Sequence, residues 1–195
     1  LGEELAFAVH LLALTYPPEV RAAYHRQYAA LMNSMGITAM SEVTMPSPED
    51  IIDQYWALKA MDNRGELTAR FYLSVVPRGD PPYTEDAIRE LDQYKEFFNS
   101  DKLRIAGIKT YIDGIPTNFS AAMLEPYDNN PSTRGSFRYP PEVPMAWIRT
   151  ANRLGYSVRA HCCGDAAVRL ALDCFEAASR ENDVSSLRNS VEHME

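Results

Sequence analysis

Hydrophobic positions repeat along this chain with two periods, one typical of helices and one typical of strands. Six stretches carry apolar residues every three or four positions, and several of them end at a glycine. The period of the second stretch depends on Tyr24, Tyr28, Leu31 and Met35. The patterns predict helices over 3–14, 17–35, 51–61, 84–98, 141–154 and 166–180, with Asp165 as the cap of the last one.

Short runs of apolar and β-branched residues lie between these helices and predict strands. The predicted strands cover 36–40, 69–76, 104–112, 156–161 and 190–193. Strands that alternate with helices are typical of parallel βαβ units. Successive strands begin 33, 35, 52 and 34 residues apart, close to the length of one such unit. We therefore expect an α/β fold with five parallel strands in sequential order, helices outside, and residues 1–195 in a single domain.

The one long interval between strands contains a loop over 114–140. This loop is rich in proline and holds four aromatic residues, which favour an ordered loop over a disordered one. Because it follows a strand, it lies at the carboxyl end of the sheet, where α/β proteins bind ligands. We expect it to form the substrate side of a site, with Tyr127, Arg134 and Phe137 bordering a pocket.

Composition and charge exclude several classes of protein. The chain has 195 residues, 46% of them hydrophobic, and 19 basic against 27 acidic residues give a net charge of −8. This composition is typical of a globular domain, and the acidic balance argues against a nucleic-acid partner. The longest apolar run, near the start, is too short to cross a membrane. Because the chain begins with Leu1 and ends inside an apparent strand, we expect a fragment of a longer protein. A cytoplasmic location is a separate expectation.

Lys109 is unusual because it lies inside a predicted strand. Alternation along this strand places Lys109, Tyr111 and Asp113 on one face. Two interpretations are open: a structural lysine that reaches water or pairs with Asp113, or a functional lysine at the mouth of a barrel.

His161 and His193 end the next two strands, one βαβ unit apart. Both are expected to point inward at the same level. Either histidine could be structural, but two at equivalent strand ends favour a shared metal, because neutral imidazole suits Zn²⁺ and similar ions.

Three cysteines, Cys162, Cys163 and Cys174, offer a competing chemistry. Cysteine next to histidine can act as a nucleophile. However, neighbouring strand residues point to opposite faces, so Cys162 is expected to face away from His161 and to serve as a small buried hydrophobic residue. The odd number and the adjacent pair do not suit a disulfide framework and favour a reducing compartment.

At these positions the sequence resembles amidohydrolase family 3, the YtcJ-like group of the metal-dependent amidohydrolase superfamily. The group includes N-substituted formamide deformylases and proteins named exoenzyme regulators. The resemblance covers about residues 100–195. Its segments are 108–114 (IKTYIDG), 121–127 (AAMLEPY), 133–135 (TRG), 159–168 (RAHCCGDAAV) and 191–193 (VEH).

The resemblance implies part of a (β/α)8 TIM-like barrel, about strands two to six, with one or two metal ions at the carboxyl ends of the strands. It implies that Lys109, His161 and His193 are ligands of Zn²⁺ or another divalent metal. The lysine at the position of Lys109 is often carboxylated in the family. The family's first-strand His-x-His pair and its general-base aspartate have no counterpart in this chain. We therefore expect metal in the full-length protein, and weak or absent binding in the fragment.

The reaction implied is hydrolysis of a non-peptide carbon–nitrogen bond, of the amide or formamide type, in a small-molecule substrate. Asp113, Tyr127, Arg134 and Phe137 are the candidate substrate-binding residues. Two alternatives are a non-catalytic regulatory or ligand-binding protein on the same scaffold, and a smaller doubly wound domain without metal. Because an incomplete barrel has exposed strand edges, we expect a homo-oligomer or a partner fragment that covers them.

Overall fold

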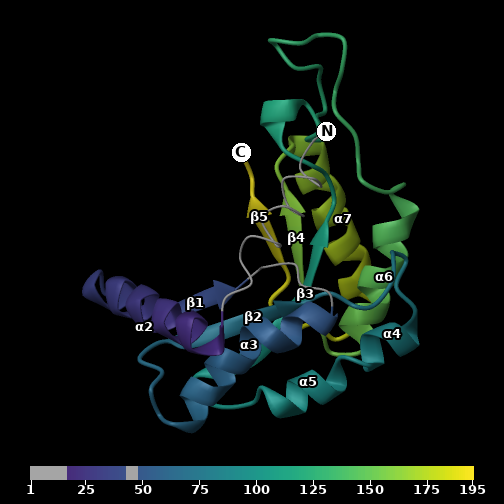
Figure 1. Cartoon of the computed structure of the whole chain (residues 1–195). Coiled ribbons are helices and arrows are strands. Elements are labelled where there is room, and N and C mark those ends of the chain that lie inside the picture. The colour runs from purple at the N-terminus through teal and green to yellow at the C-terminus, as the bar shows by residue number, and fades with distance from the viewer. Residues whose placement is uncertain (1–16, 43–47) are drawn as a thin grey trace.

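A computed structural model describes residues 17–42 and 48–195 of the chain, and within them five strands form one parallel sheet (Figure 1). The strands pair in the order β1-β2-β3-β4-β5, as predicted. They are β1 (Ala39–Glu42), β2 (Arg70–Val75), β3 (Leu103–Tyr111), β4 (Val158–Cys162) and β5 (Ser190–His193). The helices are α2 (Pro18–Ser34), α3 (Pro48–Asn63), α4 (Glu85–Arg89), α5 (Asp92–Phe97), α6 (Glu142–Arg153) and α7 (Asp165–Glu181), with a 3₁₀ turn η1 (Pro116–Asn118).

The sheet curls strongly, and a hydrogen bond across its concave face shows this directly. Arg159 Nη1 on β4 donates to Ser41 Oγ on β1 at 2.9 Å, although β2 and β3 lie between them in the sheet. In a flat sheet these strands would be roughly 14 Å apart, beyond the reach of one side chain. Curled parallel strands with outer helices make this sheet part of a TIM-like barrel, which confirms the predicted fold class.

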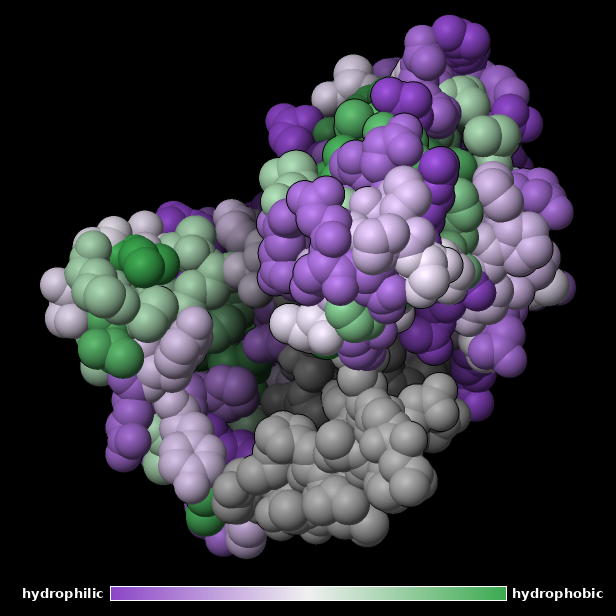
Figure 2. All heavy atoms as spheres, turned by 90° about the horizontal axis from the view of Figure 1, so that it is seen from above, coloured by the Kyte–Doolittle hydropathy of each residue, from purple (hydrophilic) through white to green (hydrophobic). Residues whose placement is uncertain are grey.

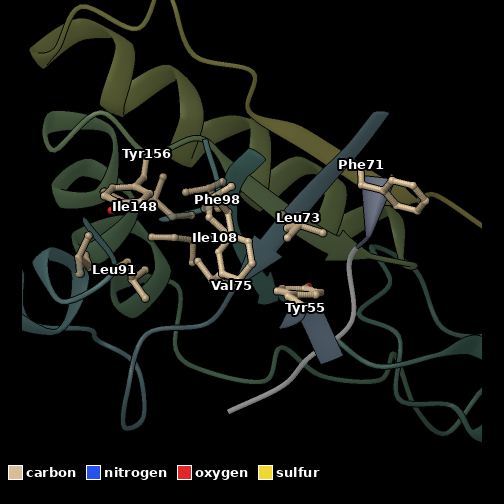
Figure 3. Close-up of a cluster of buried hydrophobic side chains, with 14 of the residues drawn as sticks. Tyr55, Phe71, Leu73, Val75, Leu91, Phe98, Ile108, Ile148 and Tyr156 are labelled. Atoms are coloured by element: carbon tan, nitrogen blue, oxygen red, sulfur yellow. The ribbon is translucent and has the colours of Figure 1, made fainter. Parts of the chain in front are cut away.

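The hydrophobic core fills the space between the outer face of the sheet and the helices (Figure 3). Phe71, Leu73 and Val75 of β2 and Ile108 of β3 are buried there. Trp147 and Ile148 from α6 and Leu170 from α7 cover the same side. One face of the sheet is thus sealed by apolar contacts, and the other is left for polar side chains.

β3 carries an extra residue that changes which side chains face the core. Leu73 of β2 pairs with Ile105, but the next residue, Ser74, pairs with Gly107, so Ala106 forms a bulge. Ile105 and Ile108 are therefore both in the core, three positions apart. The bulge places Lys109 on the opposite, concave face.

The apolar residues whose spacing predicted α2 face outward, although such a stripe normally marks the buried side of a helix. Tyr24, Tyr28, Leu31 and Met35 are 51–57% exposed, and hydrophobic side chains gather over this end of the molecule in Figure 2. The buried positions of α2 are instead small residues such as Ala22 and Ala29. Small side chains let the helix lie close to its neighbours, so burial here follows residue size rather than hydrophobicity.

The helix predicted over 84–98 is broken into α4 and α5. Leu91 N–H bonds to Ile88 O, a tighter turn than the α-helical one, and Gln93 Nε2 donates to the carbonyl oxygen of Glu90. Ile88 and Leu91, on the two sides of the break, are both buried. Thr84, at which the predicted helix begins, caps α4, with Oγ1 accepting from Ala87 N–H at 3.2 Å.

Asp165 does not cap α7, which corrects the prediction for that helix. Gly164 is the capping residue, with no side-chain hydrogen bond, and Asp165 is the first residue of the helix. Its Oδ1 accepts instead from Leu124 N–H of the 114–140 loop, at 2.8 Å. The loop is thereby attached to the start of α7, above the ends of β3 and β4 (Figure 1).

Some expectations are not tested by this architecture. The helix predicted over 3–14 falls outside the described residues. Within the described part, β1 and β5 each pair on one side only, and the expected homo-oligomer stays a prediction. Across residues 17–42 and 48–195, none of the helices is long and apolar enough to cross a membrane; a cytoplasmic location stays a prediction.

Candidate metal centre

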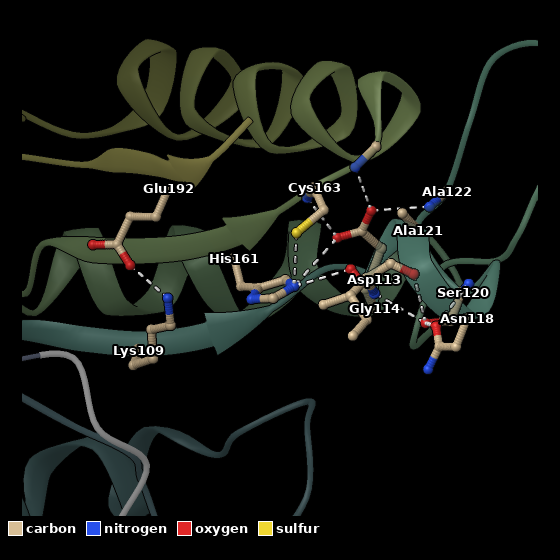
Figure 4. A network of polar contacts seen from close by, with 12 residues as sticks. Lys109, Asp113, Gly114, Asn118, Ser120, Ala121, Ala122, His161, Cys163 and Glu192 are labelled. Carbon is tan, nitrogen blue, oxygen red and sulfur yellow. Dashed lines mark hydrogen bonds and ion pairs between the residues drawn. The ribbon is translucent and has the colours of Figure 1, made fainter. Parts of the chain in front are cut away.

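Lys109 lies on the concave face of the sheet and is almost completely buried, with 1% of its surface exposed. Its Nζ forms an ion pair with Glu192 Oε2 on β5 at 2.5 Å, across the intervening strand β4 (Figure 4). The structural interpretation gave Lys109 two alternatives, contact with water or a pair with Asp113. The observed ion pair with Glu192 is neither of them. The lysine is instead paired with a carboxylate from two strands away.

Glu192 also interacts with Arg159, and neither residue was among those predicted for the site. Arg159 Nη1 lies 3.6 Å from Glu192 Oε1, so the carboxylate lies between two cations. The register of the sheet pairs Lys109 with Arg159 and His161 with Glu192, and paired residues share a face. The signal in the sequence was the same one that marked Lys109, a charged residue inside a strand.

His161 has a defined environment around one of its ring nitrogens. Nε2 lies 3.0 Å from Gly114 O and 3.4 Å from Cys163 Sγ, with Asp113 Oδ1 at 3.9 Å (Figure 4). Because a carbonyl oxygen can only accept, the tautomer that fits this contact carries its proton on Nε2, which donates a hydrogen bond to Gly114 O. The lone pair is then on Nδ1, at the opposite edge of the ring, where a metal could be bound.

His193 reaches His161 by a route that alternation does not predict. In the sheet register His193 pairs with Cys162, and Glu192 pairs with His161, so the expectation of two histidines at the same level is wrong by one residue. His193 leaves the extended conformation with φ +82°, and its ring centroid lies 4.5 Å from that of His161. Burial, with His161 and Lys109 nearby, lowers the pKa of His193, which favours the neutral form that binds metals.

Asp113 is buried at the end of β3, and its carboxylate is surrounded by backbone donors. Oδ1 accepts from Cys163 N–H at 3.0 Å, and Oδ2 accepts from Ala122 and Gly164 N–H at 2.9 and 2.8 Å. These contacts join β3, the 114–140 loop and the start of α7. Substrate binding by Asp113 stays a prediction; the role that its contacts establish is to position the groups around His161.

The other three predicted substrate residues lie in different surroundings. Tyr127 is buried with Ala121 and Cys163, and its hydroxyl donates to Ala121 O at 2.7 Å. Arg134 is exposed and donates to Leu124 O at 2.6 Å. Phe137 packs against the main core. Their contact with a substrate stays a prediction.

Two close backbone contacts require glycine, one at Gly164 between the 114–140 loop and the residues after β4, and one at Gly135 within the loop itself. A Cβ on Gly164 would lie 2.0 Å from Ala122 O, and one on Gly135, where φ is +67°, would lie 1.9 Å from Ala121 O. The loop is therefore packed against the candidate centre by backbone contacts.

Cys162 behaves as the small buried hydrophobic residue that was expected. It is completely buried in the core, and burial raises the pKa of its thiol to about 12, so it carries no thiolate at neutral pH. Cys163 follows the strand and places Sγ beside the His161 ring.

The concave face contains further polar atoms without hydrogen-bond partners. Ser74 Oγ, Arg159 Nε and Ser190 Oγ are buried and have no such partner among residues 17–42 and 48–195. Buried polar groups are normally satisfied, so this face is suited to polar contacts beyond those described. In the same residues there is no group of three His, Cys, Asp or Glu side chains that could hold a metal ion. The candidate set is therefore two histidines and Lys109.

Two solved structures with a similar fold are of uncharacterized metal-dependent hydrolases. The protein from Pyrococcus furiosus is 23% identical with a TM-score of 0.66, over 91% of this chain and 34% of that one. The protein from Pyrococcus horikoshii OT3 is 21% identical with a TM-score of 0.65, over 91% of this chain and 33% of that one. The chain thus spans about a third of the length of these proteins.

Sequence comparison gives a more specific relationship. Protein LONG AFTER FAR-RED 3 of Arabidopsis thaliana is 29% identical over 113 residues, which are 58% of this chain and 19% of that protein. The sequence model of the amidohydrolase family matches residues 2–195. This match covers nearly the whole chain and agrees with the curled parallel sheet: the chain belongs to the amidohydrolase family.

Proposed function

We propose that this chain is the central part of a hydrolase that uses a divalent metal, Zn²⁺ or a similar ion, to cleave amide-type carbon–nitrogen bonds in small molecules. The observation that carries the proposal is the meeting of His161 and His193, whose ring centroids are 4.5 Å apart at the ends of adjacent strands. Family membership and the metal-dependent hydrolases of similar fold support the same chemistry.

The residues present fit a divalent metal through their donor atoms. His161 presents Nδ1 because Nε2–H is used by Gly114, and the lowered pKa of His193 keeps its ring neutral. Lys109 is the third candidate, and it can bind a metal only after it loses its proton or is carboxylated. When bound, a divalent metal supplies Lewis acidity, which polarises the carbonyl of an amide and makes water nucleophilic at neutral pH.

The chain's own residues then orient and enclose this centre. Asp113 fixes the backbone at Cys163, two residues after His161, and the Glu192 carboxylate compensates the positive charges of Lys109 and Arg159. The 114–140 loop is attached near the carboxyl ends of β3 and β4 by the hydrogen bonds of Ala122 N–H with Asp113 and of Leu124 N–H with Asp165. The aspartate that acts as general base in the family is expected elsewhere in the full-length protein.

Amide hydrolysis by the full-length protein tests the proposal. A panel of N-substituted formamides, simple amides and matched esters is incubated with the purified protein, and amine release is measured. We expect turnover of at least one formamide or amide that is abolished by a chelator and restored by Zn²⁺ or Mn²⁺. Absence of turnover on the panel with metal-loaded protein would contradict the reaction proposed.

Elemental analysis of full-length variants tests the ligand assignment separately. His161→Ala and His193→Ala are expected to lose bound metal and activity together, and Lys109→Ala is expected to lose at least one ion. His25→Gln is the matched control, because His25 lies on α2 and packs edge-on against Phe71, 6.3 Å between ring centroids. Full metal content in His193→Ala would overturn the assignment.

A further inference from the structure

A cavity lies beside the candidate centre and shares Lys109 with it, whereas His161 and His193 do not line it. It has a volume of about 160 Å³ and lies between the segment after β2 and the last residues of the 114–140 loop. Its lining includes Lys109, Tyr111, Tyr83, Tyr139, Arg138 and Asp80. Tyrosine rings and a guanidinium therefore surround a space that adjoins the candidate metal ligands.

Tyr111 connects the cavity to the metal centre. Its ring lies 4.9 Å from the His161 ring, centroid to centroid, at an interplanar angle of 31°. Lys109 Nζ lies 5.4 Å from the centroid of the Tyr111 ring, and Arg138 Cζ lies 5.8 Å from it. Lys109 and Arg138 therefore both lie beside the Tyr111 ring, which itself lies against His161.

Arg138 is oriented by aromatic rings. Its Cζ lies 6.0 Å from the Tyr139 centroid as well as 5.8 Å from the Tyr111 centroid, both within the range of cation–π contacts. Stacking uses the faces of a guanidinium, whereas the N–H groups that match a carboxylate in two parallel hydrogen bonds are at its edge. The backbone of Arg138 is fixed as well, because its N–H donates to Ile112 O at 2.8 Å.

The size and walls of the cavity favour a six-membered ring. A cavity of about 150 Å³ lined by apolar side chains is sufficient to bind benzene, and this one has about 160 Å³. Tyr83 is held by an edge-on contact with Trp147, 5.1 Å between centroids. Burial raises the pKa of Tyr83 to about 12, so its phenol stays neutral and offers a hydroxyl at the wall.

We propose that this cavity binds the part of the substrate that carries an aromatic ring and a carboxylate, with Arg138 as the residue that selects the carboxylate. That the bound molecule is a substrate rests on the proposed function. Binding to the cavity can be measured without turnover. Asp80 lines the same cavity and, among the described residues, is the one acidic side chain in its wall. The anion is therefore placed toward Arg138 and away from Asp80.

Three small probes of the same size and different charge test the proposal on the full-length, metal-loaded protein. Benzoate, benzamide and benzylamine are titrated by calorimetry or by ligand-observed NMR. We expect benzoate to bind at least tenfold more tightly than the other two. Arg138→Gln is expected to lower the affinity for benzoate at least tenfold and to leave the affinity for benzamide unchanged. Arg138→Lys is expected to keep part of the affinity for benzoate. Asp80→Asn is expected to tighten benzoate binding.

Arg180→Gln is the matched control for charge, because Arg180 is a 72% exposed residue of α7 paired with Glu176. It is expected to bind benzoate as the wild type does. Equal benzoate affinity in Arg138→Gln, or preferential binding of benzylamine that is lost in Asp80→Asn, would overturn the proposal. If no amide is hydrolysed but benzoate binding depends on Arg138, the cavity assignment stands and the reaction assignment fails. If amides are hydrolysed without preference for a carboxylate and benzoate does not bind, the reverse holds.

Discussion

Lys109 and Glu192, 83 residues apart in the chain, form an ion pair across β4, with 1% of the lysine side chain and 18% of the glutamate side chain exposed. An ammonium in this pair has no lone pair to offer a metal. The described arrangement therefore represents a state in which the lysine is neutralised by its neighbour. Any role of Lys109 as a metal ligand requires Glu192 to give up this contact, with Arg159 available to receive the carboxylate.

The ion pair makes a first prediction about stability. Glu192→Gln leaves the buried Lys109 ammonium without its counter-charge, and removing one partner of a buried pair costs roughly 3–5 kcal/mol. The measurement is urea unfolding at neutral pH. Glu176→Gln, which breaks the exposed pair with Arg180, is the control and should leave the midpoint unchanged. Equal effects of the two variants would show that the pair contributes nothing beyond surface charge.

Asp113 provides a second prediction. Asp113→Asn keeps the shape but replaces one acceptor oxygen by an amide that faces backbone N–H donors from Ala122 and Gly164 or Cys163. Each buried N–H left unsatisfied costs roughly 1–3 kcal/mol. Unfolding should occur at lower urea, and hydrogen exchange should accelerate at these amides first. The exposed Asp128 of the same loop gives the control variant, Asp128→Asn; if its effect is as large, the network around Asp113 is not the cause.

Two glycines with the same backbone conformation separate strain from steric conflict. Gly65 has φ +68°, and no atom of the described residues lies within 4 Å of the place that a Cβ would take. Gly135 has φ +67°, and there a Cβ would lie 1.9 Å from Ala121 O. Gly65→Ala should cost roughly 1–2 kcal/mol, the penalty of the left-handed conformation. Gly135→Ala should cost about 1–3 kcal/mol more, because the loop must move away. Thermal unfolding of both variants decides this, and equal costs would mean that the loop moves without resistance.

The fourth prediction concerns alkaline pH. Burial is the main cause that raises the pKa of Cys174 from 9.0 to about 11. The unfolded chain therefore loses this proton at lower pH than the folded protein. The contribution to stability is complete below pH 9 and is lost as the pH rises toward 11. Cys174→Ala should start from a lower stability, because it leaves a small cavity, but should lose less between these pH values. Urea midpoints measured across this range test it; parallel curves would contradict the raised pKa.

Patterns in the sequence were sufficient to predict the fold and the proximity of the two candidate histidines. Helix and strand periods with regular spacing predicted five parallel strands in order, because each βαβ unit is a local structure. They also predicted that His161 and His193 would meet, since both end neighbouring strands. The level of His193 was wrong because strand alternation does not account for its positive φ.

Other features depend on contacts between distant residues, which a single sequence does not display. The partner of Lys109 is set by the curl of the sheet and by the register of three strands. The outward stripe of α2 has the same period as a buried one, and only packing decides which face is covered. The cavity beside Arg138 arises where two separate loops meet, so its lining could not be assembled from local patterns.

The extra residue in β3 has a consequence for how this segment can vary. Ala106 has no residue opposite it in β2. The number of residues before Lys109, rather than their identity, therefore decides on which side of the sheet the lysine lies. Substitutions at position 106 should be tolerated among small residues. Deletion of one residue there should turn Lys109 into the hydrophobic layer and bring Ile108 onto the polar side. We expect natural variation in this strand to preserve length more strictly than sequence.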